Sequence, residues 1–165
     1  MSPGAMEQPT AQDERFVTAV IALAQRSRDS GHHPFAALVV AADGTVVAEA
    51  MNASSQDRTA HAEMNALRLA SAQYGPEQLS GATLYSSAEP CAMCAGATYW
   101  SGVGRVVYAL SEAGLLALTG SDPENPTLAL PCRQVFASGQ RPTQVIGPWR
   151  EAEAAAVHQG FWRKG

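Results

Sequence analysis

Hydrophobic and polar positions follow helical spacing in some segments of the chain and strand spacing in others. Apolar residues recur every three to four positions over 15–27, which predicts a helix that has Asp13 as its N-cap and ends before Gly31. Two short apolar runs, 35–40 and 46–50, flank an Ala-Asp-Gly turn and predict a β-hairpin. Similar patterns predict further helices over 60–74, 91–100, 112–118, 131–138 and 151–158, and further strands over 82–86, 105–110 and 144–146.

The order of these elements predicts an α/β fold. A helix and a hairpin come first, and helices then alternate with single strands, which favours one central sheet with helices on both faces. We therefore expect a three-layer α-β-α sandwich whose mixed sheet has about five strands. Residues 1–14 are predicted to be a disordered leader, and residues 15–165 a single domain.

Composition and charge narrow the classes of function. The chain has 165 residues, with 11 Lys and Arg against 15 Asp and Glu, so its formal net charge of −4 makes nucleic acid an unfavoured partner. It contains no run of about 18 apolar residues and no signal-peptide pattern, so we expect no membrane span and a cytoplasmic location. The three cysteines, Cys91, Cys94 and Cys132, are too few for a disulfide framework.

Two short segments, 61–63 (His-Ala-Glu) and 90–94 (Pro-Cys-Ala-Met-Cys), each lie at the start of an expected helix. Cys91 and Cys94 are three residues apart, so both thiols can face one side of a helix, and His61 can add an imidazole. Three protein ligands leave zinc one open position for water, as in catalytic sites. Glu63 can then move protons between that water and a substrate. H-x-E followed by P-C-x-x-C is a known signature of zinc-dependent deaminases.

With these motifs the sequence resembles the cytidine/deoxycytidylate deaminase superfamily over residues 16–149. Pro-Phe-Ala-Ala at 34–37 resembles the first strand lining the family pocket, and residues 87–91 resemble the loop before the second zinc helix. Asn52 matches an asparagine that contacts the substrate base in this family. The resemblance implies that Zn²⁺ is bound by His61, Cys91 and Cys94, and that Glu63 transfers protons.

Within the superfamily the sequence is most similar to the bacterial guanine deaminase branch, through HPF at 33–35, HAEMNALR at 61–68 and ATYW at 97–100. This resemblance implies hydrolytic deamination of a free amino-substituted base, guanine or a related aminopurine or triazine, with release of ammonia. Members of the branch are homodimers, in some cases with an exchanged C-terminal segment, so we expect a homodimer with a small-molecule substrate. The residues expected to contact the substrate are Asn52, Phe35, Trp100 and Ala62.

The segment after Leu110 departs from the pattern of that branch and leaves the preferred base open. Asp122 and Glu124 lie in a different loop and are candidates for holding the edge of the base. The aromatic tail at 161–162, Phe-Trp, is a candidate lid, because such a tail covers the pocket in some relatives. Without the resemblance, Asn52 is also consistent with a turn residue, and the aromatic candidates with core positions.

Other functions remain open at this point. A tRNA adenosine deaminase shares both zinc motifs and the pattern at 101–107, and cytosine or a nucleoside is another possible substrate. Cys91 and Cys94 can alternatively form a redox pair, or join His61 and Cys132 in a closed structural zinc site. Cys132 lies in an apolar helical context, where a buried free thiol is the simpler interpretation. Retention of Glu63 favours catalysis, because a closed site needs no general base.

Overall fold

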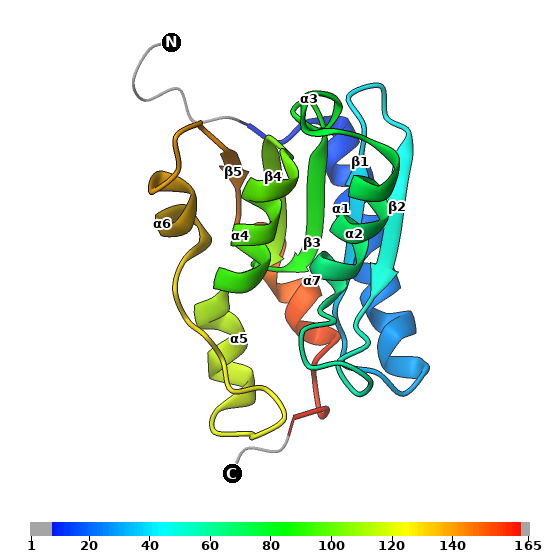
Figure 1. Ribbon diagram of the computed structural model, residues 1–165. Helices are drawn as coiled ribbons and strands as arrows, with labels where there is room; N and C mark the ends of the chain where they lie inside the picture. The colour runs from blue at the N-terminus through cyan, green and yellow to red at the C-terminus, as the bar shows by residue number, and fades with distance from the viewer. Residues whose placement is uncertain (1–7, 163–165) are drawn as a thin grey trace.

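The computed structural model describes residues 8–162 and shows a five-stranded sheet between two layers of helices (Figure 1). The strand order is β2-β1-β3-β4-β5; β1 runs antiparallel to both of its neighbours, whereas β3, β4 and β5 are parallel. This arrangement confirms the predicted α/β sandwich with a mixed sheet. The strands are β1 (Ala36–Val40), β2 (Val46–Met51), β3 (Thr83–Ala88), β4 (Arg105–Leu110) and β5 (Gln144–Ile146).

Helices bury both faces of this sheet. Because both faces are covered, β1 and β3 are buried along their whole length. β1 is apolar throughout, whereas β3 also buries Thr83, Ser86 and Ser87. One core contains side chains of α1, α5 and α7, and the other contains side chains of α2, α3, α4 and α6. The helices are α1 (Ala11–Asp29), α2 (Ala62–Gln73), α3 (Pro76–Leu79), α4 (Ala92–Ser101), α5 (Glu112–Thr119), α6 (Cys132–Ala137) and α7 (Glu151–Ala156).

The first helix begins earlier than predicted. Its N-cap is Thr10 rather than Asp13, and the two residues form a capping box in which each side chain accepts the other's backbone N–H. The Asp13 carboxylate also accepts hydrogen bonds from Tyr85 and Arg105, which fasten this turn to the sheet. Residues 11–14 of the expected leader are therefore helical, and residues 1–7 lie outside the described part of the chain.

The structure also differs from the predicted pattern in the starts of α2 and α4 and in an additional short helix, α3. His61 and Cys91 are the N-caps of α2 and α4, so these helices begin one or two residues later than predicted. Gly75 and Pro76 end α2 as expected, but Pro76 also begins the short α3, which the sequence pattern did not reveal. Among residues 8–162, no helix combines the length and apolar character needed to cross a membrane.

The parallel strands place the ends of several elements at one edge of the sheet. β3 and β4 are in register and both end there, so the residues that follow them lie side by side. The backbone N–H of Glu89, directly after β3, donates to the carbonyl of Leu110, the last residue of β4. The first turns of α4 and α5 consequently meet at this edge, next to the start of α2 (Figure 1).

Candidate metal and active site

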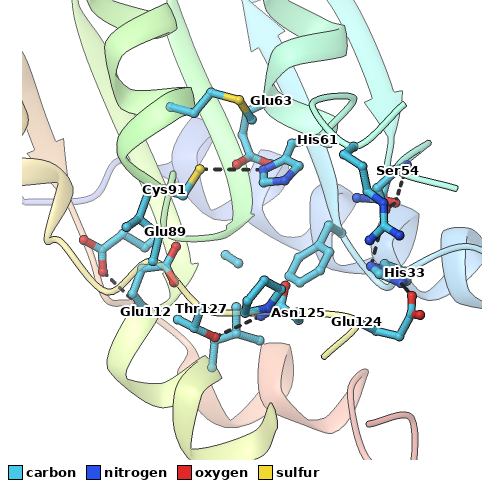
Figure 2. A pocket seen from close by; sticks show the side chains of 18 of the residues that line it. His33, Ser54, His61, Glu63, Glu89, Cys91, Glu112, Glu124, Asn125 and Thr127 are labelled. Atoms are coloured by element: carbon cyan, nitrogen blue, oxygen red, sulfur yellow. Dashed lines mark hydrogen bonds and ion pairs between the residues drawn. The ribbon is translucent and has the colours of Figure 1, made fainter. Parts of the chain in front are cut away.

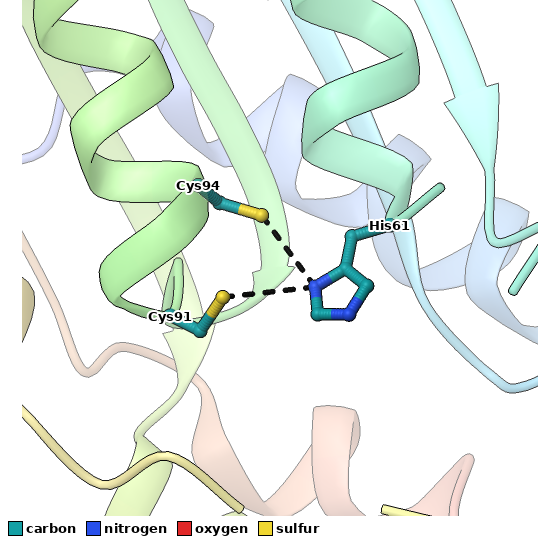
Figure 3. Close-up of side chains that lie close together, drawn as sticks. All are labelled: His61, Cys91 and Cys94. Carbon is teal, nitrogen blue, oxygen red and sulfur yellow. Dashed lines mark hydrogen bonds between the residues drawn. The ribbon is translucent and has the colours of Figure 1, made fainter. Parts of the chain in front are cut away.

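Three potential metal ligands converge where α2 and α4 begin (Figure 3). Cys91 is the N-cap of α4 and Cys94 lies in its first turn, so both thiols face the start of α2. His61, the N-cap of α2, points its Nδ1 atom between them, at 3.6 Å from each sulfur atom. The structure therefore brings together the three residues that the motifs singled out.

The geometry of these donors fits a tetrahedral zinc ion. Zn–S and Zn–N bonds of about 2.3 and 2.0 Å at tetrahedral angles separate sulfur from nitrogen by about 3.5 Å. The 3.6 Å between His61 Nδ1 and each sulfur is close to that value. Cys132 is not part of the group formed by His61, Cys91 and Cys94, so the described residues supply three protein ligands rather than four.

The thiol pair is also electrostatically prepared for a metal. Hydrogen bonds from Cys94 and from His61 outweigh burial and lower the pKa of the Cys91 thiol to about 4. The same hydrogen bond with Cys91, together with burial, raises the pKa of the Cys94 thiol. Hydrogen bonding to Cys91 raises the pKa of His61. These interactions favour the thiolate form of Cys91, which is the form that binds a metal, and a bound cation would favour the thiolate of Cys94 as well.

Glu63 lies in the first turn of α2, beside the three ligands, and its buried side chain lines the same cavity. Burial and the negative charge of Cys91 raise the pKa of its carboxyl group to about 7. A carboxyl group with a pKa near 7 can both accept and donate a proton at neutral pH, which suits a general acid–base role. Glu63 therefore lies beside the three ligands, and its role in proton transfer stays a prediction.

His61, Cys91 and Glu63 lie at the wall of a cavity of about 540 Å³ (Figure 2). Its inner part is built by the starts of α2, α4 and α5, and its outer part by two loops, 52–58 and 124–128. A volume of this size accommodates a small organic ligand. The residues that line it are His33, Phe35, Asn52, Ser54, Ser55, Arg58, His61, Glu63, Ala88, Glu89, Cys91, Met93, Glu112, Leu115, Glu124, Asn125, Pro126, Thr127 and Leu128.

Two of the expected substrate contacts lie in this cavity. Asn52 is buried, and its Oδ1 atom accepts hydrogen bonds from the backbone N–H and the hydroxyl group of Ser54, at 2.9 and 2.8 Å. With Oδ1 engaged, the Nδ2 amide of Asn52 is the group left to donate to a ligand. Phe35 offers a partly buried aromatic face to the same space.

The other two expected contacts do not line the cavity within one chain. The Ala62 side chain is fully buried in the core below α2, so only its backbone can face a ligand. Trp100 lies at the other end of α4, about 14 Å along the helix axis from Cys91, and its side chain is 81% exposed. A role for Trp100 in a pocket therefore requires a second copy of the chain.

The predicted acidic candidates behave differently from each other. Asp122 is buried outside the cavity and accepts the backbone N–H of Glu124. Glu124 lies at the cavity rim, where its carboxylate is 3.5 Å from the His33 imidazole (Figure 2). Burial lowers the pKa of His33 despite the opposing charge of Glu124. Neither Asp122 nor Glu124 therefore places a buried acidic side chain in the cavity.

Glu112 does place a buried acidic side chain in the cavity, and the sequence interpretation did not identify it. It is the first residue of α5, its side chain is buried, and it lines the cavity near Cys91 (Figure 2). Burial, reinforced by the negative charges of Cys91 and Glu63, raises the pKa of its carboxyl group to about 8. Its position two residues after an apolar strand was the available signal, since side chains at the carboxyl ends of parallel strands often line ligand sites.

The aromatic tail, Phe161 and Trp162, packs against His33 and Phe35, two residues that line the cavity. Phe161 and Trp162 contact the ring of His33, with centroids 5.8 and 5.1 Å away, and Trp162 also contacts Phe35 at 6.0 Å. Neither tail residue lines the cavity, because His33 and Phe35 lie between them and its interior. In this chain the described part of the tail supports the pocket wall rather than covering the opening.

Comparisons with known proteins agree with this site. Residues 10–110 match the family model for the zinc-binding region of cytidine and deoxycytidylate deaminases. A probable cytosine deaminase from Schizosaccharomyces pombe is 37% identical over 155 residues, which cover 93% of this chain and 94% of that protein. The guanine deaminase of Bacillus subtilis is 42% identical over 99 residues, which cover 58% of this chain and 63% of that protein.

The same relationship appears in three dimensions. The solved guanine deaminase from Nitrosomonas europaea superposes with a TM-score of 0.71 and 26% sequence identity, covering 95% of this chain and 91% of that one. The matched family region includes both zinc segments, 61–63 and 90–94. The chain therefore belongs to the cytidine and deoxycytidylate deaminase family, whose zinc-dependent chemistry depends on a His/Cys/Cys triad such as His61, Cys91 and Cys94.

Proposed function

We propose that this protein catalyses the hydrolytic deamination of a free amino-substituted base, guanine or a related aminopurine or triazine. The observation that carries the proposal is the buried carboxyl group of Glu63 next to the His61, Cys91 and Cys94 donors, in a cavity that also holds buried polar side chains. In the reaction, water and an amino-substituted ring become an oxo-substituted ring and ammonia.

His61, Cys91 and Cys94 would hold a zinc ion, which would supply activation of a water molecule. The remaining work falls to side chains of the protein. Glu63 accepts a proton from the water at a carboxylate oxygen and delivers it to the ring nitrogen. It then takes a second proton from the hydroxyl group that has added to the ring carbon and passes it to the amino group, which leaves as ammonia while the oxo group forms. Burial raises the pKa of this carboxyl group, which helps it to return the protons that it accepts. The buried surroundings keep bulk water away from these transfers.

Recognition of the ring is assigned to three side chains from different elements. Phe35 contributes an apolar surface against which a planar ring can lie. The Asn52 amide can donate from Nδ2, and the Glu112 carboxyl group can accept a hydrogen bond or, when protonated, donate one. A ring edge that carries both N–H and acceptor groups matches such a pair. Guanine, diaminopurines and aminotriazines all have edges of this kind.

Cytosine is the second candidate substrate. The observation in its favour is the extent of the match with the Schizosaccharomyces pombe relative, a probable cytosine deaminase, which covers 93% of this chain against 58% for the Bacillus subtilis guanine deaminase. The divergent segment after Leu110, which contributes Glu112 and residues 124–128 to the cavity, falls within this longer match. A pyrimidine would occupy the inner part of the cavity and leave more of its outer part to water.

A substrate panel tests the proposal. Purified protein loaded with one zinc per chain is incubated with guanine, 2,6-diaminopurine, cytosine, an aminotriazine and an adenosine-containing tRNA, and ammonia release is followed. We expect turnover of one purine or triazine substrate and none with Glu63→Ala. A preference for cytosine would instead support the second candidate function, deamination of cytosine. Turnover of tRNA alone, or of nothing in the panel, would refute both.

A further inference from the structure

The Glu89 side chain connects three separate parts of the chain beside the cavity. Glu89 lies between β3 and the first zinc-binding cysteine, and its side chain is buried. Its Oε1 atom accepts the backbone N–H of Glu112 at 3.0 Å (Figure 2), and its Oε2 atom accepts the backbone N–H of Cys132 at 2.8 Å. One carboxylate therefore links the zinc-binding turn to two positions that lie 23 and 43 residues further along the chain.

Both donors are groups that need a partner outside their own helix. Glu112 and Cys132 are the first residues of α5 and α6, and the first N–H groups of a helix have no intrahelical acceptor. A buried N–H group without a partner is costly, and a charged acceptor makes the strongest replacement. Each oxygen of the Glu89 carboxylate accepts one of these N–H groups. Any effect of Glu89 on the cavity therefore comes from where it holds the starts of α5 and α6.

The segment between the two donors forms one wall of the cavity. Residues 112–132 include Glu112 and Leu115 in its inner part and residues 124–128 in its outer part. Hydrogen bonds within the segment, such as Asn125 to Thr127 and Glu124 to Asp122, shape it but do not fix its distance from the metal ligands. The bonds to Glu89 connect both ends of the segment directly to the zinc-binding turn.

We propose that Glu89 is a positioning residue, which holds the wall formed by residues 112–132 at a fixed distance from the zinc-binding turn and thereby controls substrate binding. The proposal rests on the proposed function for its kinetic consequence, but the positioning itself can be measured without any substrate. A purely structural role elsewhere in the fold would lower stability without a specific effect on this wall.

The first test replaces Glu89 by glutamine. The Glu89→Gln side chain keeps the shape but has one oxygen, so it directs an amide N–H₂ group at one of the two backbone donors and loses that anchor. We expect amide hydrogen exchange over residues 112–131 to rise about tenfold, since local opening becomes easier. We expect KM to rise about tenfold with a smaller change in kcat, and zinc to stay at one per chain.

Asp13→Asn is the matched control. Asp13 is also a buried carboxylate with backbone and side-chain donors, but it fastens α1 to Tyr85 in β3 and to Arg105 at the start of β4, the strand end opposite the cavity. This variant should lower the melting temperature while leaving KM and the exchange of residues 112–131 unchanged. The comparison separates a general loss of stability from a displacement of the wall.

A second pair of variants removes the donor instead of the acceptor. Cys132→Pro deletes the N–H that bonds to Glu89, whereas Cys132→Ala keeps it. Pro131 has φ −58° and ψ 135°, which is allowed before proline, and the first residue of a helix tolerates proline. Only the proline variant should reproduce the faster exchange and the raised KM. If Glu89→Gln does not fold, the comparison of Cys132→Pro with Cys132→Ala still tests whether the bonds to Glu89 position the wall.

Three results would overturn the proposal. The first is unchanged exchange and unchanged KM in both Glu89→Gln and Cys132→Pro. The second is a loss of zinc that accounts for all of the lost activity, with KM unchanged, because Glu89 would then support the metal site alone. The third is an equal effect of Cys132→Ala. If wild-type protein deaminates nothing in the panel, the proposed function fails, and the exchange measurements still decide whether Glu89 positions the wall.

Discussion

Glu63 and Glu112 bring two buried carboxyl groups into one cavity from two different helices. Their pKa values are both raised, to about 7 and about 8, because burial disfavours the charged form and the nearby Cys91 thiolate adds negative charge. Glu63 lies next to the metal ligands, so the task of moving protons belongs to it. Glu112 lies on the wall formed by α5, which suits it to contact the ring edge rather than the reacting water.

Glu63→Gln tests the proton-transfer role. Glutamine has nearly the same shape but cannot accept and return a proton at neutral pH, so we expect kcat to fall about 10²- to 10⁴-fold with zinc retained. Ammonia release and zinc content per chain are the measurements. Glu77→Gln, an exposed carboxylate in α3, is the control and should behave as wild type. A Glu63→Gln enzyme that keeps more than a tenth of its turnover would remove Glu63 from the mechanism.

Glu112→Gln tests the recognition of the ring edge. The amide cannot present the same donor and acceptor groups as the carboxyl group, so a substrate matched to Glu112 loses a buried hydrogen bond. We expect kcat/KM to fall at least tenfold for the preferred base and less for bases with a different edge. The ratio of kcat/KM between the preferred base and the others should therefore decrease. Glu77→Gln, at an exposed carboxylate outside the cavity, is the control and should leave selectivity unchanged. An equal loss for every base would assign Glu112 to the chemistry or to the fold instead.

Among the elements, α1 shows how tertiary contacts move a helix boundary. Asp13 was a reasonable N-cap by sequence, but its carboxylate binds Arg105 at 2.7 and 2.6 Å and Tyr85 at 2.6 Å, and Thr10 caps the helix instead. Burial alone would raise the pKa of Asp13, yet the hydrogen bonds from Arg105, Tyr85 and Thr10 lower it well below its usual range. These partners come from distant parts of the chain, which local spacing cannot show.

This shift predicts an acid-dependent contribution to stability. A carboxylate whose pKa is lower in the folded state stabilises the fold above its unfolded pKa, near 4, and loses that contribution as the pH falls below it. Asp13→Asn should therefore cost about 3 kcal/mol at pH 7, and its melting temperature should approach that of wild type as the pH drops below about 4. Thermal unfolding from pH 7 to pH 2 is the measurement. Parallel curves for the two proteins would contradict the assignment.

The tail after α7 predicts a second pH effect, at higher pH. Burial and the nearby Arg28 lower the pKa of His158 to about 4, and its Nδ1 atom accepts a hydrogen bond from Trp162 at 2.9 Å. The packed tail holds His158 neutral, so its packing is fully stable above the ordinary histidine pKa of about 6.5 and weakens as the pH falls from there toward 4.

Fluorescence of Trp162 measures this release. In a Trp100→Phe/Trp149→Phe background, the emission of Trp162 should shift to the red between pH 6.5 and 4, as the indole becomes exposed to water. His158→Gln keeps an acceptor but does not titrate, so it should show no shift in this range. The same red shift in the glutamine variant would assign the change to His33 or to another group.

At the scale of the whole molecule, the sequence predicted the architecture and the metal site but not the complete pocket. The zinc ligands and Glu63 are encoded by short spacings within two helix starts, so they can be recognised without a fold. Glu112 lies in the cavity only because two parallel strands end at the same edge, and a glutamate at a helix start is otherwise ordinary. Trp100 was expected beside the ring, but the structure places its exposed side chain at the end of α4 away from Cys91, which local sequence similarity could not show.

Trp100 therefore provides the test of the expected homodimer. An indole side chain that is 81% exposed on a short helix contributes little to its own chain, whereas tryptophan is a frequent anchor of protein interfaces. We expect the protein to sediment at twice the 17.3 kDa of one chain, and Trp100→Glu to sediment as a monomer. Val46→Glu, at an exposed position of the edge strand β2, should remain dimeric.

If the partner's indole completes the pocket, KM should rise for the Trp100 variant as the dimer dissociates and should recover with increasing protein concentration. A wild-type protein that sediments as a monomer at micromolar concentration would confine the active site to one chain and leave Trp100 without a role in it.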